Sequence, residues 1–136
     1  CPQLWTEEFL HDLANKLKPN GRLITYSSAA SIRASLKRAS LKVFSISPIS
    51  KINDQWSSGT VAIKEKVQNN DPLNQKLFKE LTLMEEEHLQ TKAAIPYRDS
   101  TGQSSKDEIL LQRKIEQQKS KMPSTSSWKK RWNKAK

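Results

Sequence analysis

The strongest candidates for chemistry are three adjacent side chains, Tyr97, Arg98 and Asp99, which directly follow Pro96. The proline restricts the backbone of the loop that carries them. The Arg98 guanidinium could hold a phosphate or a carboxylate, and the Asp99 carboxylate could pair with an ammonium group or accept its proton. The alternative is structural: Arg98 and Asp99 pair with surface groups, and Tyr97 packs the loop against the rest of the protein.

Basic side chains are concentrated near the end of the chain. Residues 105–136 carry ten basic and three acidic side chains, within a formal net charge of +10 for all 136 residues. Ammonium and guanidinium groups neutralise phosphates and indoles stack on unpaired bases, so this composition favours contact with RNA over the alternative, a solvated helix face. We also expect at least one indole to dock on the protein, because an exposed pair of tryptophans is unfavourable. The candidate RNA contacts are Arg113, Lys114, Trp128, Lys129, Lys130, Arg131 and Trp132.

Polar residues also end the first predicted strand. The apolar run at 22–28 predicts a strand covered on both faces, and Tyr26 and Ser27 stand near its end. Because strand ends line ligand sites in α/β folds, these two are the candidate cofactor contacts, while Ser28 could equally cap the next helix. No glycine-rich turn accompanies them: the three glycines are isolated, at 21, 59 and 102.

Other reactive residue types predict little chemistry. Glu85 and His88 have the Glu-x-x-His spacing of di-iron ligands, but such sites need a second copy and further carboxylates, so no metal is expected. Cys1 is the sole cysteine, so the sequence can form no internal disulfide, which fits a reducing, cytoplasmic setting. No base lies near Cys1 in the sequence, so it is not expected to act as a nucleophile. No apolar run approaches the ~20 residues that span a bilayer. The chain opens on Cys1 rather than Met, so we expect it to begin inside a larger product.

Apolar periodicity predicts the elements that position these residues. Helices are expected at 6–18 and 29–40, the second with Arg33 and Lys37 facing solvent. Further strands are expected at 42–47 and 60–65, both half-buried. Together these elements predict an α/β layer with three strands over residues 1–67.

The pattern changes after this layer. A linker is expected at 68–72, followed by helices at 73–90 and 105–121, the latter opened by a Ser105–Glu108 capping box. With the loop at 91–105 they form a helical extension over 68–121. Residues 122–136 are expected to form a flexible, basic tail that contains two tryptophans.

Several blocks of this sequence resemble one enzyme family. "PQLWT" (2–6), "LKPNGRLITYS" (17–27) and "AASIRASL" (29–36) are similar to the P-x-L-W-T/S, L-x-P-G-G-x-L-x-T-Y-S and A-x-x-V/I-R-x-x-L patterns of the MnmC-type methyltransferase domain. "AAIPYRDST" and "DEILLQRKIEQQ" resemble its stand-alone members, which end in PYRDP followed by I-x-x-R-R-x-x-E. Asn20, Ser100 and Lys114 depart from these patterns.

The resemblance implies a fold and a reaction. The fold is the C-terminal half of a class I (Rossmann-like) methyltransferase with a helical C-terminal extension. The reaction uses S-adenosyl-L-methionine (SAM) to methylate the aminomethyl group of a modified wobble uridine in tRNA, with Tyr97, Arg98 and Asp99 positioning the substrate or accepting its proton.

The resemblance also implies that the glycine-rich half, the partner of this chain, lies upstream of Cys1. We therefore expect the chain alone to bind SAM weakly and to be inactive, and we expect no FAD domain. Two other functions remain open: a non-catalytic basic RNA-binding module, and an assembly protein whose incomplete sheet pairs with another chain.

Overall fold

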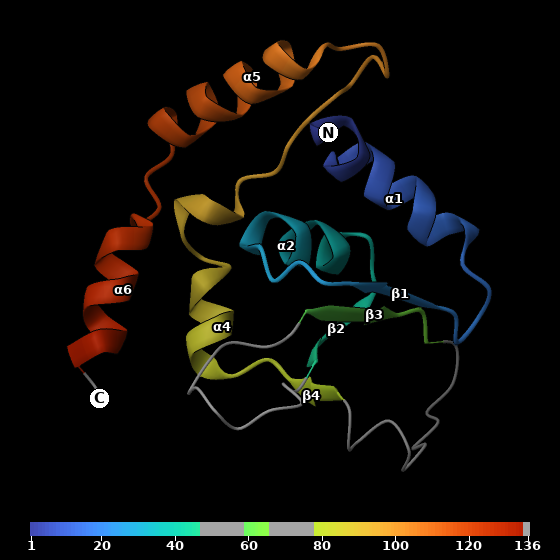
Figure 1. Cartoon of the computed structure of the whole chain (residues 1–136), viewed down its shortest axis with the longest axis horizontal. Coiled ribbons are helices and arrows are strands. Elements are labelled where there is room, and N and C mark those ends of the chain that lie inside the picture. The colour runs from blue at the N-terminus through green and yellow to red at the C-terminus, as the bar shows by residue number, and fades with distance from the viewer. Residues whose placement is uncertain (47–58, 66–77, 135–136) are drawn as a thin grey trace.

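A computed structural model describes residues 1–46, 59–65 and 78–134 (Figure 1). The predicted linker at 68–72 and the first part of the predicted helix 73–90, up to residue 77, lie outside these residues. Among the described residues, no helix is long and apolar enough to cross a membrane. In chain order the elements are η1 (Pro2–Trp5), α1 (Glu7–Lys16), β1 (Arg22–Thr25), α2 (Ala30–Arg38), β2 (Lys42–Ile46), β3 (Thr60–Ile63), β4 (Phe78–Glu80), α4 (Leu83–His88), η2 (Lys92–Ala94), α5 (Lys106–Lys119) and α6 (Thr125–Lys134).

The described strands form one sheet of four strands in the order β1-β3-β2-β4. Neighbouring strands are antiparallel, so β1 and β2 run in the same direction with the reversed strand β3 between them. In this register Ala62 of β3 lies opposite both Leu23 of β1 and Val43 of β2. Helices and sheet in one layered unit confirm the predicted α/β class, with β4 as a strand that the sequence did not indicate.

The main core lies between the sheet and the helices α1 and α2. These helices bury the stripes that the sequence predicts, and β2, β3 and the residue before β2 supply the other side. Burial of these apolar side chains is the main stabilising contribution. The fully buried members are Leu10, Ala14, Ile32, Leu36, Leu41, Val43 and Ala62.

The prediction that β1 is covered on both faces is wrong. Leu23 packs against the core, but Ile24 is 62% exposed and Tyr26, just beyond the strand, is 96% exposed. The strand is the end strand of the described sheet, and alternate residues of a strand point to opposite faces. One face of β1 therefore contacts the core and the other is open. Strand β3, expected to be half-buried, is instead buried at all four residues because it lies inside the sheet.

The turn before β1 depends on two adjacent residues. Asn20 has a left-handed φ of 64°, a conformation that asparagine adopts more readily than most residues, which explains why it replaces glycine here. A side chain at Gly21 would place its Cβ 2.7 Å from the Lys18 carbonyl oxygen, so glycine is needed there. The Lys64 amide donates to the Gly21 carbonyl oxygen at 3.0 Å, which ties this turn to the end of β3.

The region around residue 80 also differs from the sequence prediction. Residues Phe78–Glu80 form β4, paired with β2, and a helix begins only at Leu83. The Thr82 side chain accepts from the Glu85 amide, and the Glu85 side chain accepts from the Thr82 amide, forming a capping box. This cap sets the start of α4 and separates it from the strand.

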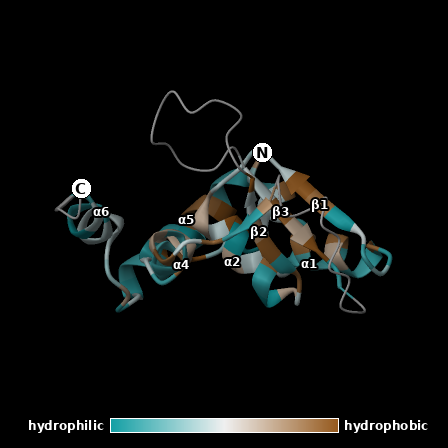
Figure 2. Cartoon of the chain, turned by 90° about the horizontal axis from the view of Figure 1, so that it is seen from below, coloured by the Kyte–Doolittle hydropathy of each residue, from teal (hydrophilic) through white to brown (hydrophobic). Residues whose placement is uncertain are grey.

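The C-terminal residues form two helices. The Ser105–Glu108 capping box opens α5 as predicted. Residues predicted as part of a flexible tail include α6, whose ribbon is mostly hydrophilic in Figure 2. The Trp128 side chain, 7% exposed, docks this helix on α4: its indole stacks on His88 with ring centroids 4.3 Å apart. The predicted docking of one tryptophan is confirmed.

Candidate functional site around Tyr97, Arg98 and Asp99

The candidate site is built on the first turn of α1. Thr6 caps this helix, since its hydroxyl oxygen accepts from the Phe9 amide at 3.2 Å. Glu7 and Glu8 follow in the first turn, where the helix dipole favours negative charge. The cap and the adjacent acids are local features of the sequence, and they present two carboxylates at one end of the helix.

The backbone of residues 97–99 is held against this helix start. Tyr97 forms an isolated parallel bridge with Thr6, and the Glu7 amide donates to the Tyr97 carbonyl oxygen at 2.8 Å. The Asp99 amide donates to the Glu8 carboxylate at 2.9 Å. A loop and a helix that are far apart in the sequence therefore form one local structure.

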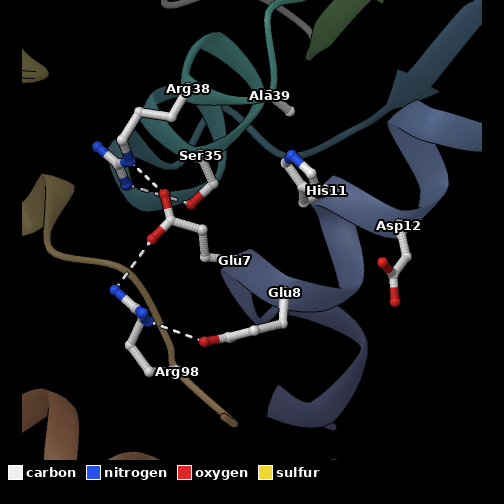
Figure 3. Close-up of a pocket in the computed structure, with 8 residues that line it drawn as sticks. All are labelled: Glu7, Glu8, His11, Asp12, Ser35, Arg38, Ala39 and Arg98. Carbon is white, nitrogen blue, oxygen red and sulfur yellow. Dashed lines mark hydrogen bonds and ion pairs between the residues drawn. The ribbon is translucent and has the colours of Figure 1, made fainter.

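Arg98 lies between the two acids of the helix (Figure 3). Its Nε donates to Glu8 Oε1 at 2.9 Å, and its NH1 lies 3.4 Å from Glu7 Oε2. The Glu7 carboxylate also pairs with Arg38 of α2, so it lies between two guanidinium groups. These residues line a pocket of about 310 Å³ that also includes His11.

The ionisation of Glu8 and Arg98 follows from this contact. Partial burial alone would raise the pKa of Glu8, but hydrogen bonds from the Asp99 amide and from Arg98 outweigh it and lower the pKa overall. The hydrogen bond to Glu8 raises the pKa of Arg98. Both groups stay charged in this pair, and a phosphate or carboxylate that binds Arg98 has to compete with Glu7 and Glu8.

The Asp99 carboxylate organises its own turn. Its Oδ1 accepts from the Gly102 amide at 3.0 Å and from the Ser104 amide at 3.2 Å. Hydrogen bonds from Ser104, its side chain first, lower the pKa of Asp99. A carboxylate with a lowered pKa is a weaker proton acceptor, so this geometry favours pairing with an ammonium group over general-base action.

Arg113, predicted to contact RNA, contacts this loop. Its guanidinium lies 4.4 Å from the centre of the Tyr97 ring and donates to the carbonyl oxygens of Ile95 (2.8 Å) and Ala93 (3.0 Å). The side chain fastens the Tyr97 loop to α5. Its donors are directed at backbone oxygens, which leaves Arg113 poorly placed to contact a phosphate.

Three other predicted RNA contacts also bind groups within the protein. The Trp128 Nε1 donates to the Met84 carbonyl oxygen at 3.0 Å, and the Trp132 Nε1 donates to Glu87 Oε2 at 3.0 Å. Arg131 pairs with the same Glu87 at 3.0 Å. Because its indole is buried on His88, Trp128 cannot stack on a base without undocking α6. Lys114, Lys129 and Lys130 are exposed and make no ion pair with a described residue.

The two candidate cofactor contacts differ in availability. The Tyr26 side chain is almost fully exposed at the end of β1. The Ser27 carbonyl oxygen accepts from Thr60 Oγ1 at 2.7 Å, and the Ser27 hydroxyl oxygen accepts from the Ala29 amide. Tyr26 is therefore open to a ligand, whereas Ser27 shapes the turn that leads into α2.

Arg33, predicted to face solvent, is 1% exposed, which corrects that expectation. Its NH1 lies 2.5 Å from Glu85 Oε2, its Nε donates to Thr60 Oγ1 at 2.8 Å, and its NH2 donates to the Gly59 carbonyl oxygen at 3.0 Å. Thr60 in turn donates to Ser27, so a chain of hydrogen bonds connects α4 to the end of β1. This network takes up Glu85, and His88 stacks on Trp128, so the Glu-x-x-His pair serves packing. Within the described part of the chain no three metal-ligating side chains gather.

Sequence reasoning missed Glu7, Glu8 and Arg38 as members of the site, because acids at a helix start are explained by the dipole alone. It also missed Arg33. The spacing of the sequence does indicate that Arg33 is buried. Arg33 is four residues after Ala29 and three before Leu36, which places it at the edge of the apolar stripe of this helix.

Part of this chain is similar to proteins of a known family. Residues 1–55 match the model of an S-adenosyl-L-methionine-dependent methyltransferase family. A solved structure, MnmC2 from Aquifex aeolicus, is similar with a TM-score of 0.64 and 28% sequence identity, over 88% of this chain and 35% of that chain. The chain thus spans little more than a third of the structure that it matches, and no curated protein matches it. These two matches confirm the predicted resemblance and support an MnmC-type methyltransferase domain.

Proposed function

We propose that this chain is part of a cytoplasmic, SAM-dependent methyltransferase that methylates the aminomethyl group of a modified wobble uridine in tRNA. One observation carries the proposal: the similarity to the solved structure of MnmC2 extends over 88% of this chain. The family model supports SAM as the methyl donor. The tRNA substrate follows from the family resemblance and from the basic side chains of α5 and α6.

The residues of this chain fit the margin of a SAM site. SAM supplies a sulfonium methyl group to the substrate amine, which must be neutral and close to it. Tyr26 offers an exposed ring at the end of β1, on the side where the sequence predicts cofactor contact. The Asp99 carboxylate attracts the ammonium form of the substrate, which has to release a proton to water before its nitrogen can take the methyl group, and Arg98 holds the segment that carries Asp99.

The glycine-rich turn that would hold most of the cofactor has no counterpart in this sequence. Its three glycines are isolated, and the chain matches 35% of the related structure. We therefore propose that an N-terminal half of the same domain supplies the rest of the SAM site, and that the 136 residues alone do not catalyse methyl transfer.

Two measurements test this function. Titration calorimetry of the 136-residue chain with SAM should show no binding in the micromolar range, and micromolar affinity would refute the need for a second half. The natural protein, given tRNA that carries 5-aminomethyl-2-thiouridine and methyl-labelled SAM, should label that nucleoside. Binding of the tRNA without any labelling would instead identify a non-catalytic RNA-binding module.

A further inference from the structure

A second pocket shares none of its lining residues with the pocket drawn in Figure 3. It has a volume of about 270 Å³ and is bounded by η1, the start of α2, Tyr97 and the start of α5. Trp5 and Tyr97 supply aromatic rings, Ser31 and Ile32 supply the first turn of α2, and Lys106 supplies a positive charge. None of the described residues that line it is acidic.

Helix α2 begins in this pocket without a side-chain cap. Its N-cap residue is Ala29, which offers no oxygen, whereas hydroxyl groups cap α1, α4 and α5. The amides of the first turn of a helix have no partner within the helix. At α2 the residues that carry them, Ala30, Ser31 and Ile32, are all buried. Buried amides without an acceptor are costly, so the start of α2 is suited to receive acceptor atoms from a ligand.

The Ser31 side chain independently points to a ligand. It is 4% exposed, it lines the pocket, and its hydroxyl makes no hydrogen bond with a described residue. Buried hydroxyl groups normally have a partner. Its position at the second residue of α2 places this donor beside the uncapped amides.

The remaining lining residues add charge and stacking surface. Lys106 is exposed at the first position of α5 and makes no ion pair with a described residue. Trp5 and Tyr97 are half-buried, and Arg113 and the Glu7 amide hold Tyr97 in place. A site with amide donors, a hydroxyl, an ammonium group and two aromatic rings matches a phosphate joined to a flat base.

We propose that this pocket binds a single nucleotide of RNA, which extends the proposed function by naming the residues that hold the target nucleotide. The phosphate oxygens accept from the first-turn amides of α2 and the Ser31 hydroxyl, and they pair with Lys106. The base packs against Trp5 and Tyr97.

Amide and indole NMR shifts of the chain, titrated with uridine 5′-monophosphate, test this inference. The nucleotide should shift the Ser31 and Ile32 amides and the Trp5 indole together. Uridine alone should shift only the indole, and inorganic phosphate only the amides, each with weaker affinity. If phosphate alone binds as tightly as the nucleotide, or if S-adenosylhomocysteine shifts these signals and the nucleotide does not, the inference is wrong.

Matched variants locate the contacts. Lys106→Gln and Ser31→Ala should each weaken nucleotide binding about tenfold, the loss expected for a hydrogen bond to a charged group. Lys16→Gln, at the far end of α1, and Ser35→Ala, one turn further along α2, should bind as the wild type does. Equal losses in both sets would refute the site. These titrations measure nucleotide binding and not methyl transfer. If the natural protein proved inactive, the proposed function would be refuted but the nucleotide site would not.

Discussion

At the scale of single residues, the buried Arg33 side chain joins a helix, a strand and the end of another strand. It connects α2 with Glu85 of α4 and with Thr60 of β3, and Thr60 holds the Ser27 carbonyl at the end of β1. A buried ion pair is strongly destabilised when one partner is removed, because the other charge is left without compensation. A second pair, Lys37–Glu86, links the same two helices but is exposed.

The first prediction compares these two pairs. Arg33→Met should lower the free energy of unfolding by about 3–5 kcal/mol, the cost of leaving a buried charge unpaired. Lys37→Met, which breaks the exposed pair on the same helix, should lower it by about 0–1 kcal/mol. Urea titration followed by circular dichroism measures both values. Similar losses for the two variants would show that Arg33 is not the main link between α2 and α4.

At the scale of elements, α6 depends on α4 for its place. The Trp128 ring stacks on His88, and Trp132 and Arg131 both contact Glu87. Burial lowers the pKa of His88, and Arg33 and Lys129 lower it further, against the opposing effect of Glu85. The docked state therefore favours the neutral imidazole.

The second prediction concerns this histidine. Its folded pKa lies below the ordinary value of about 6.5, so the unfolded chain binds more protons. The contribution of His88 to the free energy of unfolding is fully present above the ordinary pKa of about 6.5, and it is lost as the pH falls through the pKa of the folded state. Comparing urea titrations at pH 8 and pH 5, the His88→Gln variant should lose less stability than the wild type. A wild-type pH dependence of stability in His88→Gln would contradict this assignment.

At the scale of the whole molecule, exposed lysines and an exposed part of the sheet lie on different elements. The exposed lysines Lys114, Lys129 and Lys130 lie on α5 and α6, whereas the exposed Ile24 and Tyr26 lie on or next to β1 at the end of the described sheet. An exposed apolar end strand is a surface on which further strands add. This arrangement agrees with the proposed contacts, in which the helical extension binds RNA and β1 pairs with an N-terminal half of the domain.

The third prediction tests the basic surface. Replacing Lys129 and Lys130 together with Ala should weaken tRNA binding and reduce the slope of log affinity against log salt by about 2, one unit for each lost phosphate contact. Fluorescence anisotropy with labelled tRNA over a series of salt concentrations measures the slope. Lys16→Ala with Lys18→Ala, at the end of α1 and just after it, is the matched control. An equal change in both double variants would indicate a general charge effect and exclude a local contact by α6.

The starts and ends of several helices could be predicted from the sequence. Thr6, Pro19 and Gly21 bracket α1, the capping box at Ser105 starts α5, and the apolar stripes of α1 and α2 face the core. These features depend on neighbouring residues, so they can be recognised without the fold. The motifs at 2–6, 17–27 and 29–36 likewise carried the family resemblance.

Only the tertiary structure decided what each polar side chain meets. Arg33, Arg113 and Trp128 have types that suit solvent or RNA, yet each is engaged by groups distant in the sequence. The pairing of Arg98 with Glu7 and Glu8, and the pocket between Trp5, Ser31 and Lys106, also join separate elements. Spacing along the chain sets local hydrogen bonds and helix faces, whereas such partners depend on how helices and strands pack. For that reason the candidate loop was predictable and its surroundings were not.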